Sequence, residues 1–359
     1  MTNIENSIET PNKPAAGYYS ERPTKVIEAD EQYKLVMAIT LDKESGYSRG
    51  ILRCITSRVG EFQIGGTIDK SELHWVNKEP SGTYKIGEKV LIKNEDEMMS
   101  TLAVEGTQFL GLEDPDIYYD EKEKLYHLYF TIPFIHNVRR SIIKSRIHLG
   151  HAVGPSLDEL EMTPPVLSSD GVYRAKEVSI PPVNKDGFRY CLVESSDIVD
   201  DDRYSVVRTA KAMQLGGRWE YGDIVFHPAE CGLEWIGGHA SPGPLLPKDF
   251  IDVGEGKLLG FMNGREANQE VGNKTLYGTF SVGLFIYDYE KGVIDWVSPV
   301  PFIQDSEAKT ITFASQFVYT GEGSGVLYAH GDDSWVRAYD ISVEGIKAFA
   351  RDVCRKDLS

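Results

Sequence analysis

The sequence predicts an all-β protein, a five-bladed β-propeller with an irregular N-terminal arm and a short C-terminal helix. Apolar and aromatic runs typical of strands recur along the chain at intervals of about 60 to 70 residues. Gly, Asp, Asn or Ser lies near each run, and helix-period stretches are few. Such a repeat indicates sheets of about four antiparallel strands packed radially around a channel. A two-domain β-sandwich is the alternative, because strand counts alone do not prove that the ring closes.

The repeat is marked by five apolar runs, which lie at residues 50–56, 125–130, 188–193, 257–262 and 325–329. Before the first run, residues 1–22 are mostly polar and contain Pro11, Pro14 and Gly17, which predicts an irregular arm. Residues 23–345 are assigned to the propeller. The segment 343–355 has a helical pattern, so residues 346–359 are predicted to form a closing helical tail.

Composition limits the partners and the compartment. With 359 residues and 41% hydrophobic content, the chain can bury a large core. Its 55 acidic and 38 basic residues leave a net charge of -17, which repels phosphate backbones and anionic lipid surfaces. Neither nucleic acid nor a membrane is therefore expected as a partner. The four cysteines form no Cys-x-x-Cys pair, and the polar start is unlike a secretory signal, so a reduced, cytoplasmic setting is expected.

Two adjacent carboxylates, Glu113 and Asp114, precede Pro115 in the most informative stretch of the chain. A proline biases the residue before it towards extended backbone, so Asp114 is expected to be extended and aimed by the chain itself. The strand that follows is expected to begin near Tyr118. The alternative is that Asp114 only caps a turn that enters this strand.

Acidic and basic residues stand at corresponding places of the repeat. In a propeller the innermost strands line the channel, so groups at the starts of these strands converge at one mouth. The groups expected there are Arg53, Arg58, Asp114, Lys176, Glu177, His239, His330, Asp332 and Asp333. Asp114 and Glu177 are the natural pair of carboxylates. Cleavage of a glycosidic bond needs one group that protonates the leaving oxygen and one that activates or becomes the nucleophile.

Each of these residues also has a structural interpretation. Glu177 beside Lys176 can be a solvated or salt-bridged acid, and His239 can be a polar loop residue. Arg53 is a stronger site candidate, because it lies in an apolar strand where an unpaired charge is costly to bury.

Other types of site find little support in the sequence. His148 and His151 lack the His-Glu-x-x-His spacing of a zinc protease, so no metal site and no cofactor are expected. The glycine-rich segment 321–325 has no following Lys-Ser or Lys-Thr, and it predicts a hairpin turn instead of a phosphate loop.

The order of motifs resembles glycoside hydrolase family 130, five-bladed propellers that include β-mannoside phosphorylases and β-1,2-mannosidases. The segments that carry the resemblance lie at residues 51–58, 111–116, 175–181, 237–244 and 326–333. The resemblance implies that Asp114 is the catalytic acid, acting through a sugar hydroxyl, and that Lys176 with Arg53 or Arg58 binds phosphate or sugar hydroxyls. Asp114 and Glu177 are thus the expected catalytic residues. The expected substrate-binding residues are Arg53, Arg58, Glu113, Lys176, His239, Asn263 and Asp333.

Three departures from the family pattern bear on the acceptor. Asp116 stands where the family's Glu-Asp-Pro-Arg motif has its arginine, which replaces an anion binder with a group that repels phosphate. Glu177 stands where the family has Asp, and Asn263-Gly-Arg265 replaces a His-Gly pair. These departures favour water over phosphate as the acceptor.

The sequence therefore predicts a glycoside-cleaving enzyme for β-linked manno-oligosaccharides, with hydrolysis favoured over phosphorolysis. The base would be Glu177, or else Glu230 or Glu234. A phosphorylase, with inorganic phosphate as the second substrate, is one alternative, and the sequence is compatible with a homo-oligomer. A furanosidase of the families 32, 43 and 68 kind would need another essential Asp in the first blade, where only Asp42 and Asp69 are found, at poor positions. A non-catalytic carbohydrate-binding propeller is the third alternative.

Overall fold

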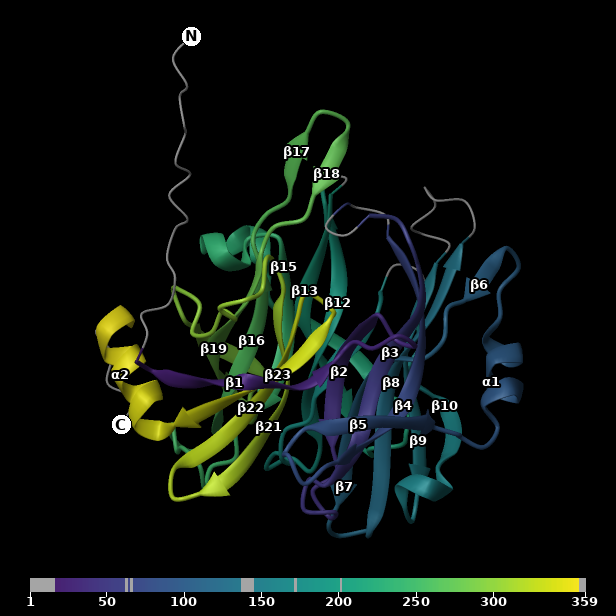
Figure 1. Cartoon of the computed structure of the whole chain (residues 1–359), viewed down its shortest axis with the longest axis horizontal. Helices are drawn as coiled ribbons and strands as arrows, with labels where there is room; N and C mark the ends of the chain where they lie inside the picture. Colours follow the sequence, from purple (N-terminus) through teal and green to yellow (C-terminus); the bar gives the residue numbers. More distant parts are fainter. Residues whose placement is uncertain are drawn as a thin grey trace.

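The structure is a computed structural model of the chain that describes residues 17–61, 64, 67–136, 145–170, 173–200 and 202–354. The described chain is mostly β, and its α-helices are α1 (Glu95–Leu102) and α2 (Val343–Cys354). Figure 1 shows α1 and α2 on opposite sides of the molecule, with strands between them. The prediction of a mostly β protein with a short C-terminal helix is confirmed, whereas α1 was not expected from the sequence. No helix in the described ranges has the length and apolar character needed to span a bilayer.

Most strands pair antiparallel with the strand that precedes or follows them in the chain. The first sheet contains β2 (Leu35–Leu41), β3 (Arg49–Val59), β4 (Ile68–Lys78) and β5 (Tyr84–Lys89). The second contains β7 (Glu113–Asp120), β8 (Leu125–His136), β9 (Arg146–Gly154) and β10 (Glu161–Leu167), with β6 (Thr107–Phe109) also on β8. The sheet that holds the first and the last strand consists of β21 (Thr312–Gly321), β22 (Ser324–Gly331), β23 (Trp335–Ser342) and β1 (Tyr19–Glu28).

An eight-stranded sheet lies between these in sequence. Its first part consists of β11 (Lys176–Ser179), β12 (Arg189–Val199), β13 (Asp202–Ala212) and β14 (Glu220–Phe226). Its second part consists of β15 (His239–Leu245), β16 (Lys257–Arg265), β19 (Phe280–Asp288) and β20 (Val293–Val297). One parallel bridge, Ser205 to His239, joins the two parts. The remaining elements are the hairpin of β17 (Gln269–Val271) and β18 (Lys274–Leu276) and the 3-10 turns Leu157–Glu159, Pro228–Glu230 and Glu234–Ile236.

The predicted apolar runs fall on corresponding strands. They lie in β3, β8, β12, β16 and β22. Each of these strands pairs with the strand that precedes it in the chain, namely β2, β7, β11, β15 and β21. Their residues are buried almost without interruption; β8, for example, is buried from His127 to Phe134. Continuous burial is expected where both faces of a sheet are covered, and it explains why these runs were the strongest signals in the sequence.

The hydrophobic core lies between successive sheets. One cluster joins β3 and β4 to β8 and β9, through residues such as Ile51 and Phe130, and the next joins β8 and β9 to β12 and β13. A further cluster packs Val36 and Leu52 of the first sheet against Val336 of the last. The sheets are thus held to one another by apolar contact, including the contact between the last sheet and the first.

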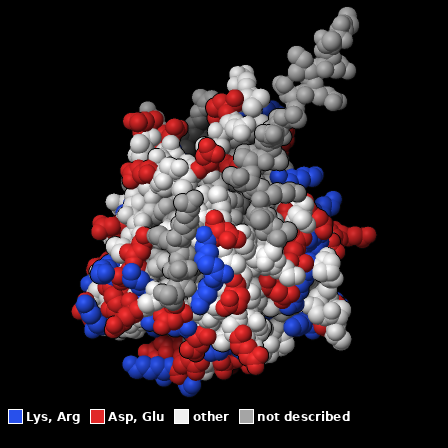
Figure 2. Space-filling view, turned by 90° about the vertical axis from the view of Figure 1, so that its left-hand side faces the viewer, with Lys and Arg blue, Asp and Glu red and all other residues white. Residues whose placement is uncertain are grey.

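The first strand, β1, and the last strand, β23, lie in the same sheet. β1 begins at Tyr19, so residues 19–22 of the expected arm belong to a strand, and residues 1–16 lie outside the described residues. β1 pairs with β23, which links the beginning of the described chain to its end by hydrogen bonds. α2 begins at Val343, directly after β23. Figure 2 shows acidic and basic side chains interleaved on the face that it presents.

The first strands of three successive units contain a bulge at a corresponding position. The register shifts between Met37 and Ile39 in β2, between Glu113 and Asp116 in β7, and between Lys176 and Val178 in β11. A residue with positive φ lies inside each shift: Ala38 at 50°, Asp114 at 50° and Glu177 at 27°. Bulges re-aim side chains, and backbone in this region costs a non-glycine residue of order 1–3 kcal/mol.

This geometry corrects two predictions about the Glu113-Asp114-Pro115 stretch. Asp114 is not extended, since its φ of 50° lies in the left-handed region. The strand expected near Tyr118 begins at Glu113, so Asp114 lies within β7 and does not precede it. The preference imposed by Pro115 is local, and the bulge with its tertiary contacts overrides it.

Candidate functional site

The centre of the candidate site is a buried arginine held by two carboxylates. Arg53 lies on β3 and is 6% exposed, while Glu113 and Asp114 lie at the start of the neighbouring β7. The Nη1 of Arg53 donates to Oδ1 of Asp114 at 2.7 Å, and its Nη2 lies 2.9 Å from Oε1 of Glu113. Its Nε donates to the hydroxyl of Ser71 at 2.9 Å. The sequence argument that a charge in this apolar strand needs a partner is therefore satisfied by these three groups.

Lys176 supplies a second cation from β11. Its Nζ lies 3.2 Å from Oδ2 of Asp114 and 3.6 Å from Oε2 of Glu113. Two acids and two bases thus form one largely buried group, in which burial raises the pKa of Glu113 above its usual value. Burial alone would raise the pKa of Asp114, but Arg53 and Lys176 more than offset burial and hold this pKa well below its usual range. Asp114 is therefore ionised at neutral pH.

Glu177 differs from Asp114 in its protonation. Burial raises the pKa of Glu177 well above its usual value, and the nearby negative charge of Asp114 raises it further. Lys176 acts in the opposite direction but does not compensate. The two carboxyl groups that the sequence paired thus have pKa values pushed apart, which is how one site can hold both a proton donor and an ionised carboxylate.

A second buried acid, Glu194 on β12, was not predicted. Its Oε2 lies 3.2 Å from Nε2 of His239, and its side chain is buried. Burial opposes ionisation of Glu194, but His239 and then Lys176 lower its pKa below the ordinary value. The signal that could have found Glu194 is the one that identified Arg53, a charged residue that continues an apolar strand run. The predicted site residue His239 is therefore tied to an acid that the prediction missed.

Three arginines carry buried nitrogens without hydrogen-bond partners among the described residues; Arg174 and Arg265 lie near Glu194, and Arg203 lies near Arg174. These nitrogens are Nε of Arg174, Nε of Arg265 and all three side-chain nitrogens of Arg203. Burial and the neighbouring Arg203 lower the pKa of Arg174 to about 10, and burial lowers the pKa of Arg203 and Arg265. The guanidinium of Arg265 stacks on the ring of Tyr277 at 4.5 Å. Buried guanidinium groups without partners are costly, and an oxyanion satisfies them best.

The remaining predicted cation, Arg58, belongs to a chain of charges beside Arg53. Its Nε and Nη2 donate to the two oxygens of Asp69, each at 2.7 Å, and Nη2 also donates to Asp333 at 3.0 Å. His330 is buried and lies 3.7 Å from Asp333 through Nε2, and its Nδ1 accepts from the backbone N–H of Ala38. The structure thus joins Arg58, Asp333 and His330, which come from the two ends of the sequence.

Comparisons with known proteins identify solved structures with a similar fold. No protein-family model matches the sequence, and no curated protein matches it. Among solved structures, β-1,2-mannobiose phosphorylase from Listeria innocua has a TM-score of 0.64 at 12% identity and covers 94% of this chain and 99% of its own. A structure reported for GH130 glycoside hydrolases that target β-1,2 mannosidic linkages in Candida mannan has a TM-score of 0.63 at 17% identity, with 93% and 96% covered. A glycosyl hydrolase from Bacteroides ovatus has a TM-score of 0.62 at 16% identity, with 91% and 94% covered.

The chain has the fold of glycoside hydrolase family 130. The resemblance predicted from the order of motifs agrees with these neighbours, which are mannoside phosphorylases and glycoside hydrolases. At these identities the agreement concerns the fold, and the site must be argued from its own residues.

Within this family 130 fold, Asn263, an expected substrate-binding residue, contacts the backbone of β21. It is fully buried on β16, its Nδ2 donates to the carbonyl of Ala314 at 3.1 Å, and its Oδ1 accepts from the N–H of Ala314 at 2.7 Å. Both amide groups are therefore engaged by β21. Asn263 ties β16 to β21, and its side chain is fully buried.

Other acids expected near the site also have specific places. Asp332 accepts backbone N–H groups from Lys309, Thr310 and Ile311, so it holds a loop. Glu230 and Glu234, the alternative bases, lie in exposed positions of short 3-10 turns. No described ion pair connects them to the group around Asp114.

Asp116, the main sequence argument against phosphate, lines a cavity of about 190 Å³ together with Glu177, Ser179 and Gln316. Burial raises the pKa of Asp116 to about 7. Near neutral pH it is therefore only partly ionised. It does not act as the fixed negative charge that the sequence argument assumed.

Proposed function

We propose that this protein cleaves β-linked mannosides and that inorganic phosphate is the acceptor. The observation that carries the proposal is the combination of an acid–base group, formed by Arg53, Glu113, Asp114 and Lys176, with the unpartnered guanidinium nitrogens of Arg174, Arg203 and Arg265. The first group supports sugar binding through directional charged hydrogen bonds. The second supports an oxyanion beside it.

The electrostatics support a different division of roles from the one expected. Asp114 is ionised and held by Arg53 and Lys176, so it is suited to accept hydrogen bonds from sugar hydroxyls. Burial raises the pKa of Glu177 well above its usual value, which suits it to carry a proton and give it to the leaving glycosidic oxygen. The glycosidic bond then breaks as a phosphate oxygen bonds to the anomeric carbon. The products are a sugar 1-phosphate and the shortened oligosaccharide.

Phosphate is favoured over water by two observations. Arg203 leaves all three side-chain nitrogens without a partner in the described structure, which water as acceptor would not require. Asp116, which seemed to exclude phosphate, has a pKa of about 7 and lines a cavity with Glu177. One neighbour, a mannose phosphorylase from Leishmania mexicana with a TM-score of 0.52, is described in complex with a phosphate ion.

Hydrolysis is the second candidate, and Glu194 favours it. This acid is buried, ionised and paired with His239, so it can act as a base towards a water molecule while Glu177 acts as the acid. The furanosidase alternative loses support. The position on β2 that corresponds to Asp114 and Glu177 holds Ala38, which has no carboxylate.

We also propose that the sheets are five blades around one channel. The support is the single parallel bridge that divides the eight-stranded sheet and the cavity lined by β2, β7, β11, β15 and β21 residues. On this interpretation the propeller begins with β1 at Tyr19 and ends with β23 at Ser342, and α2 follows it.

Incubation with a panel of β-linked manno-oligosaccharides, with and without inorganic phosphate, tests the proposal. Formation of a sugar 1-phosphate that depends on phosphate is the expected result. Release of free sugar at the same rate in both conditions would show that the protein is a hydrolase and would reject phosphorolysis. Saturable binding of a glycan without turnover would support the carbohydrate-binding alternative and reject both.

A further inference from the structure

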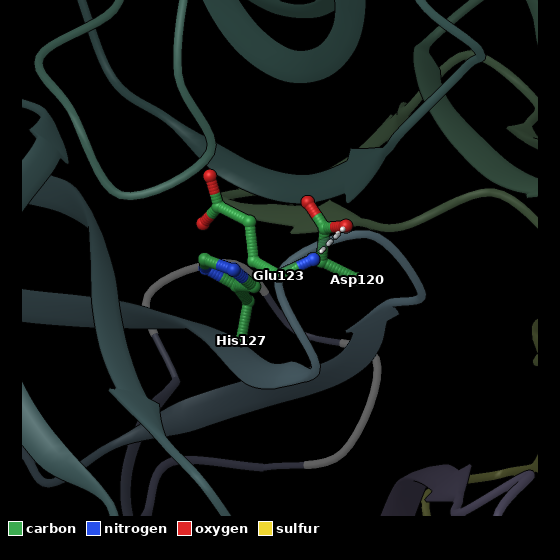
Figure 3. A group of neighbouring side chains, drawn as sticks. All are labelled: Asp120, Glu123 and His127. Carbon is green, nitrogen blue, oxygen red and sulfur yellow. Dashed lines mark hydrogen bonds between the residues drawn. The ribbon is translucent and has the colours of Figure 1, made fainter.

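The turn between β7 and β8 brings together three side chains that can ligate a metal ion. They are Asp120 at the end of β7, Glu123 in the turn and His127 on β8, and one ligand atom from each lies within 4.8 Å of the others. Figure 3 shows the carboxylate of Glu123 beside the His127 ring, with Asp120 next to them. The group lies at the opposite end of β7 from Asp114, about 20 Å away at the usual rise per strand residue.

The histidine supplies the observation that sets this group apart from an ordinary acidic turn. His127 is 3% exposed, and its Nε2 is buried without a hydrogen-bond partner in the described structure. Its Nδ1 lies 2.8 Å from Nε2 of His151. Because Nδ1 is engaged in this way, Nε2 is the ring nitrogen left for a ligand role. A buried imidazole nitrogen facing two carboxylates without any partner needs an explanation.

The hydrogen bonds behind His127 are compatible with a tautomer that leaves Nε2 without a proton. Nδ1 of His151 lies 2.7 Å from the hydroxyl of Thr163, and that hydroxyl donates to the carbonyl of Pro164 at 3.2 Å. Each group therefore has a consistent role when His127 donates from Nδ1 to His151 and His151 donates from Nδ1 to Thr163. Nε2 of His127 is then an unprotonated lone pair. Metal-binding histidines are oriented by such a chain behind the ring.

The carboxylates of Asp120 and Glu123 are also available to a cation. Oδ1 of Asp120 accepts the backbone N–H groups of Lys122 and Glu123 at 2.8 and 3.1 Å, which fixes the carboxylate and leaves Oδ2 free of these bonds. Of the neighbouring charges, Glu121 pairs with Lys43 at 3.2 Å and with Lys124 at 3.6 Å, and Arg189 lies near enough to lower the pKa of both Asp120 and His127. No ion pair satisfies Asp120 or Glu123 among the described residues.

We propose that Asp120, Glu123 and His127 bind a divalent transition-metal ion, with Zn²⁺ as the ion of best fit. One imidazole and two carboxylates suit zinc, and the usual ligand bonds of about 2.0–2.2 Å require only that the exposed Glu123 side chain swing inward. This assignment differs from the sequence expectation of no metal site. The site is structural, because it closes the β7–β8 hairpin far from Asp114, and it stands independently of the proposed mannoside chemistry.

Zinc binding is measured on the full chain after chelator treatment and dialysis, by titration calorimetry with ZnCl₂ and by metal analysis of the protein. The expected result is one Zn²⁺ per chain and a rise in the melting temperature of about 3 °C at a hundredfold excess of zinc over its dissociation constant. Glu123→Gln and Asp120→Asn should each weaken binding at least tenfold. Both keep the fold, since Glu123 is exposed and Asn can maintain the turn of Asp120.

The matched control is Glu121→Gln, which removes a carboxylate from the same turn but lies outside the group. It should leave the zinc stoichiometry and the thermal shift unchanged. The proposal is overturned if the wild type binds no zinc. It is equally overturned if zinc binds but Glu123→Gln, Asp120→Asn and Glu121→Gln all behave like the wild type, because the ion then lies elsewhere. Neither outcome depends on glycosidase or phosphorylase activity.

Discussion

Arg53 donates to Asp114 at 2.7 Å across the first two sheets, and both side chains are buried. The sequence separates them by 61 residues. The contact joins β3 to a strained bulge in β7 and gives Asp114 a fixed negative charge with a fixed direction. The tests of the site therefore begin with this pair.

Replacement of Asp114 by Asn should reduce turnover about 100-fold or more and destabilise the fold by about 3 kcal/mol. The variant keeps the size and the left-handed tolerance of the residue but leaves Arg53 and Lys176 without their carboxylate partner. Steady-state kinetics and urea unfolding measure the two effects. Glu121→Gln, an exposed acid at the far end of the hairpin, is the control and should change neither. Full activity in Asp114→Asn would remove Asp114 from the site.

Glu177 should control the alkaline side of the activity profile. Burial raises its pKa well above the usual value, and it loses its proton as pH rises through the folded-state pKa. The ratio kcat/KM should therefore fall at high pH in the wild type. Glu177→Gln should lower activity about 10²–10⁴-fold and abolish this limb. An alkaline limb that persists in Glu177→Gln would assign the acid to another residue.

Arg203 should determine the response to phosphate. Substitution by Ala removes three unpartnered donors, so the KM for phosphate should rise about tenfold or more while the KM for the glycan changes little. Arg203→Lys should restore only part of the effect, because an ammonium cannot bind an oxyanion bidentately. Arg351 on α2 is exposed, and Arg351→Ala serves as the control. Equal loss for glycan and phosphate would contradict an anion-specific role.

Because of Asp116, the free energy of unfolding should decrease as pH rises. Its pKa is about 7 in the folded protein and near 3.8 when exposed, so between these values the folded state binds more protons and loses stability with increasing pH. Asp116→Asn removes this dependence. It should stabilise the protein by about 1–2 kcal/mol at pH 8, discounted for the partial exposure of Asp116, and by progressively less towards pH 4. Chemical unfolding at pH 5 and pH 8 measures the difference, and an equal effect at both would rule out the shifted pKa.

Asn263 should affect folding more than substrate binding. Asn263→Ala leaves the buried N–H and carbonyl of Ala314 without partners, which should cost about 2–4 kcal/mol. The KM for the glycan should change less than about twofold, because both ends of the amide face β21. A large rise in KM at unchanged stability would restore the substrate-binding role expected from the sequence.

Much of the fold could be predicted because its signals are local. The apolar runs on β3, β8, β12, β16 and β22 are buried on both faces, so each is a continuous run in the sequence. The helical periodicity of α2 was equally readable. The short inner strands were less visible, since β11 has only four residues and β7 begins inside an Asp-Pro stretch that looked like a turn.

For the candidate site, too, some properties could be predicted from the sequence and others could not. The types of residue were readable from the sequence, because a charge in or beside an apolar strand needs a reason, and this identified Arg53, Asp114, Lys176 and Glu177. Glu194 satisfied the same criterion and was missed. The state of each group was not readable. Protonation depends on burial and on charges from distant strands, so the contrast between ionised Asp114 and protonated Glu177 exists only after folding.

The sequence by itself determined the all-β class, the recurrence of its strands and the residues from which a sugar site could be made. These follow from hydrophobic pattern and residue chemistry, which act over short distances along the chain. The tertiary structure alone decided that Asp114 adopts a left-handed backbone, that the Asn263 amide bonds to β21, and that three arginines are left with unsatisfied donors. Each of these depends on groups far apart in sequence, whose distances and dielectric surroundings are set only when the sheets pack together.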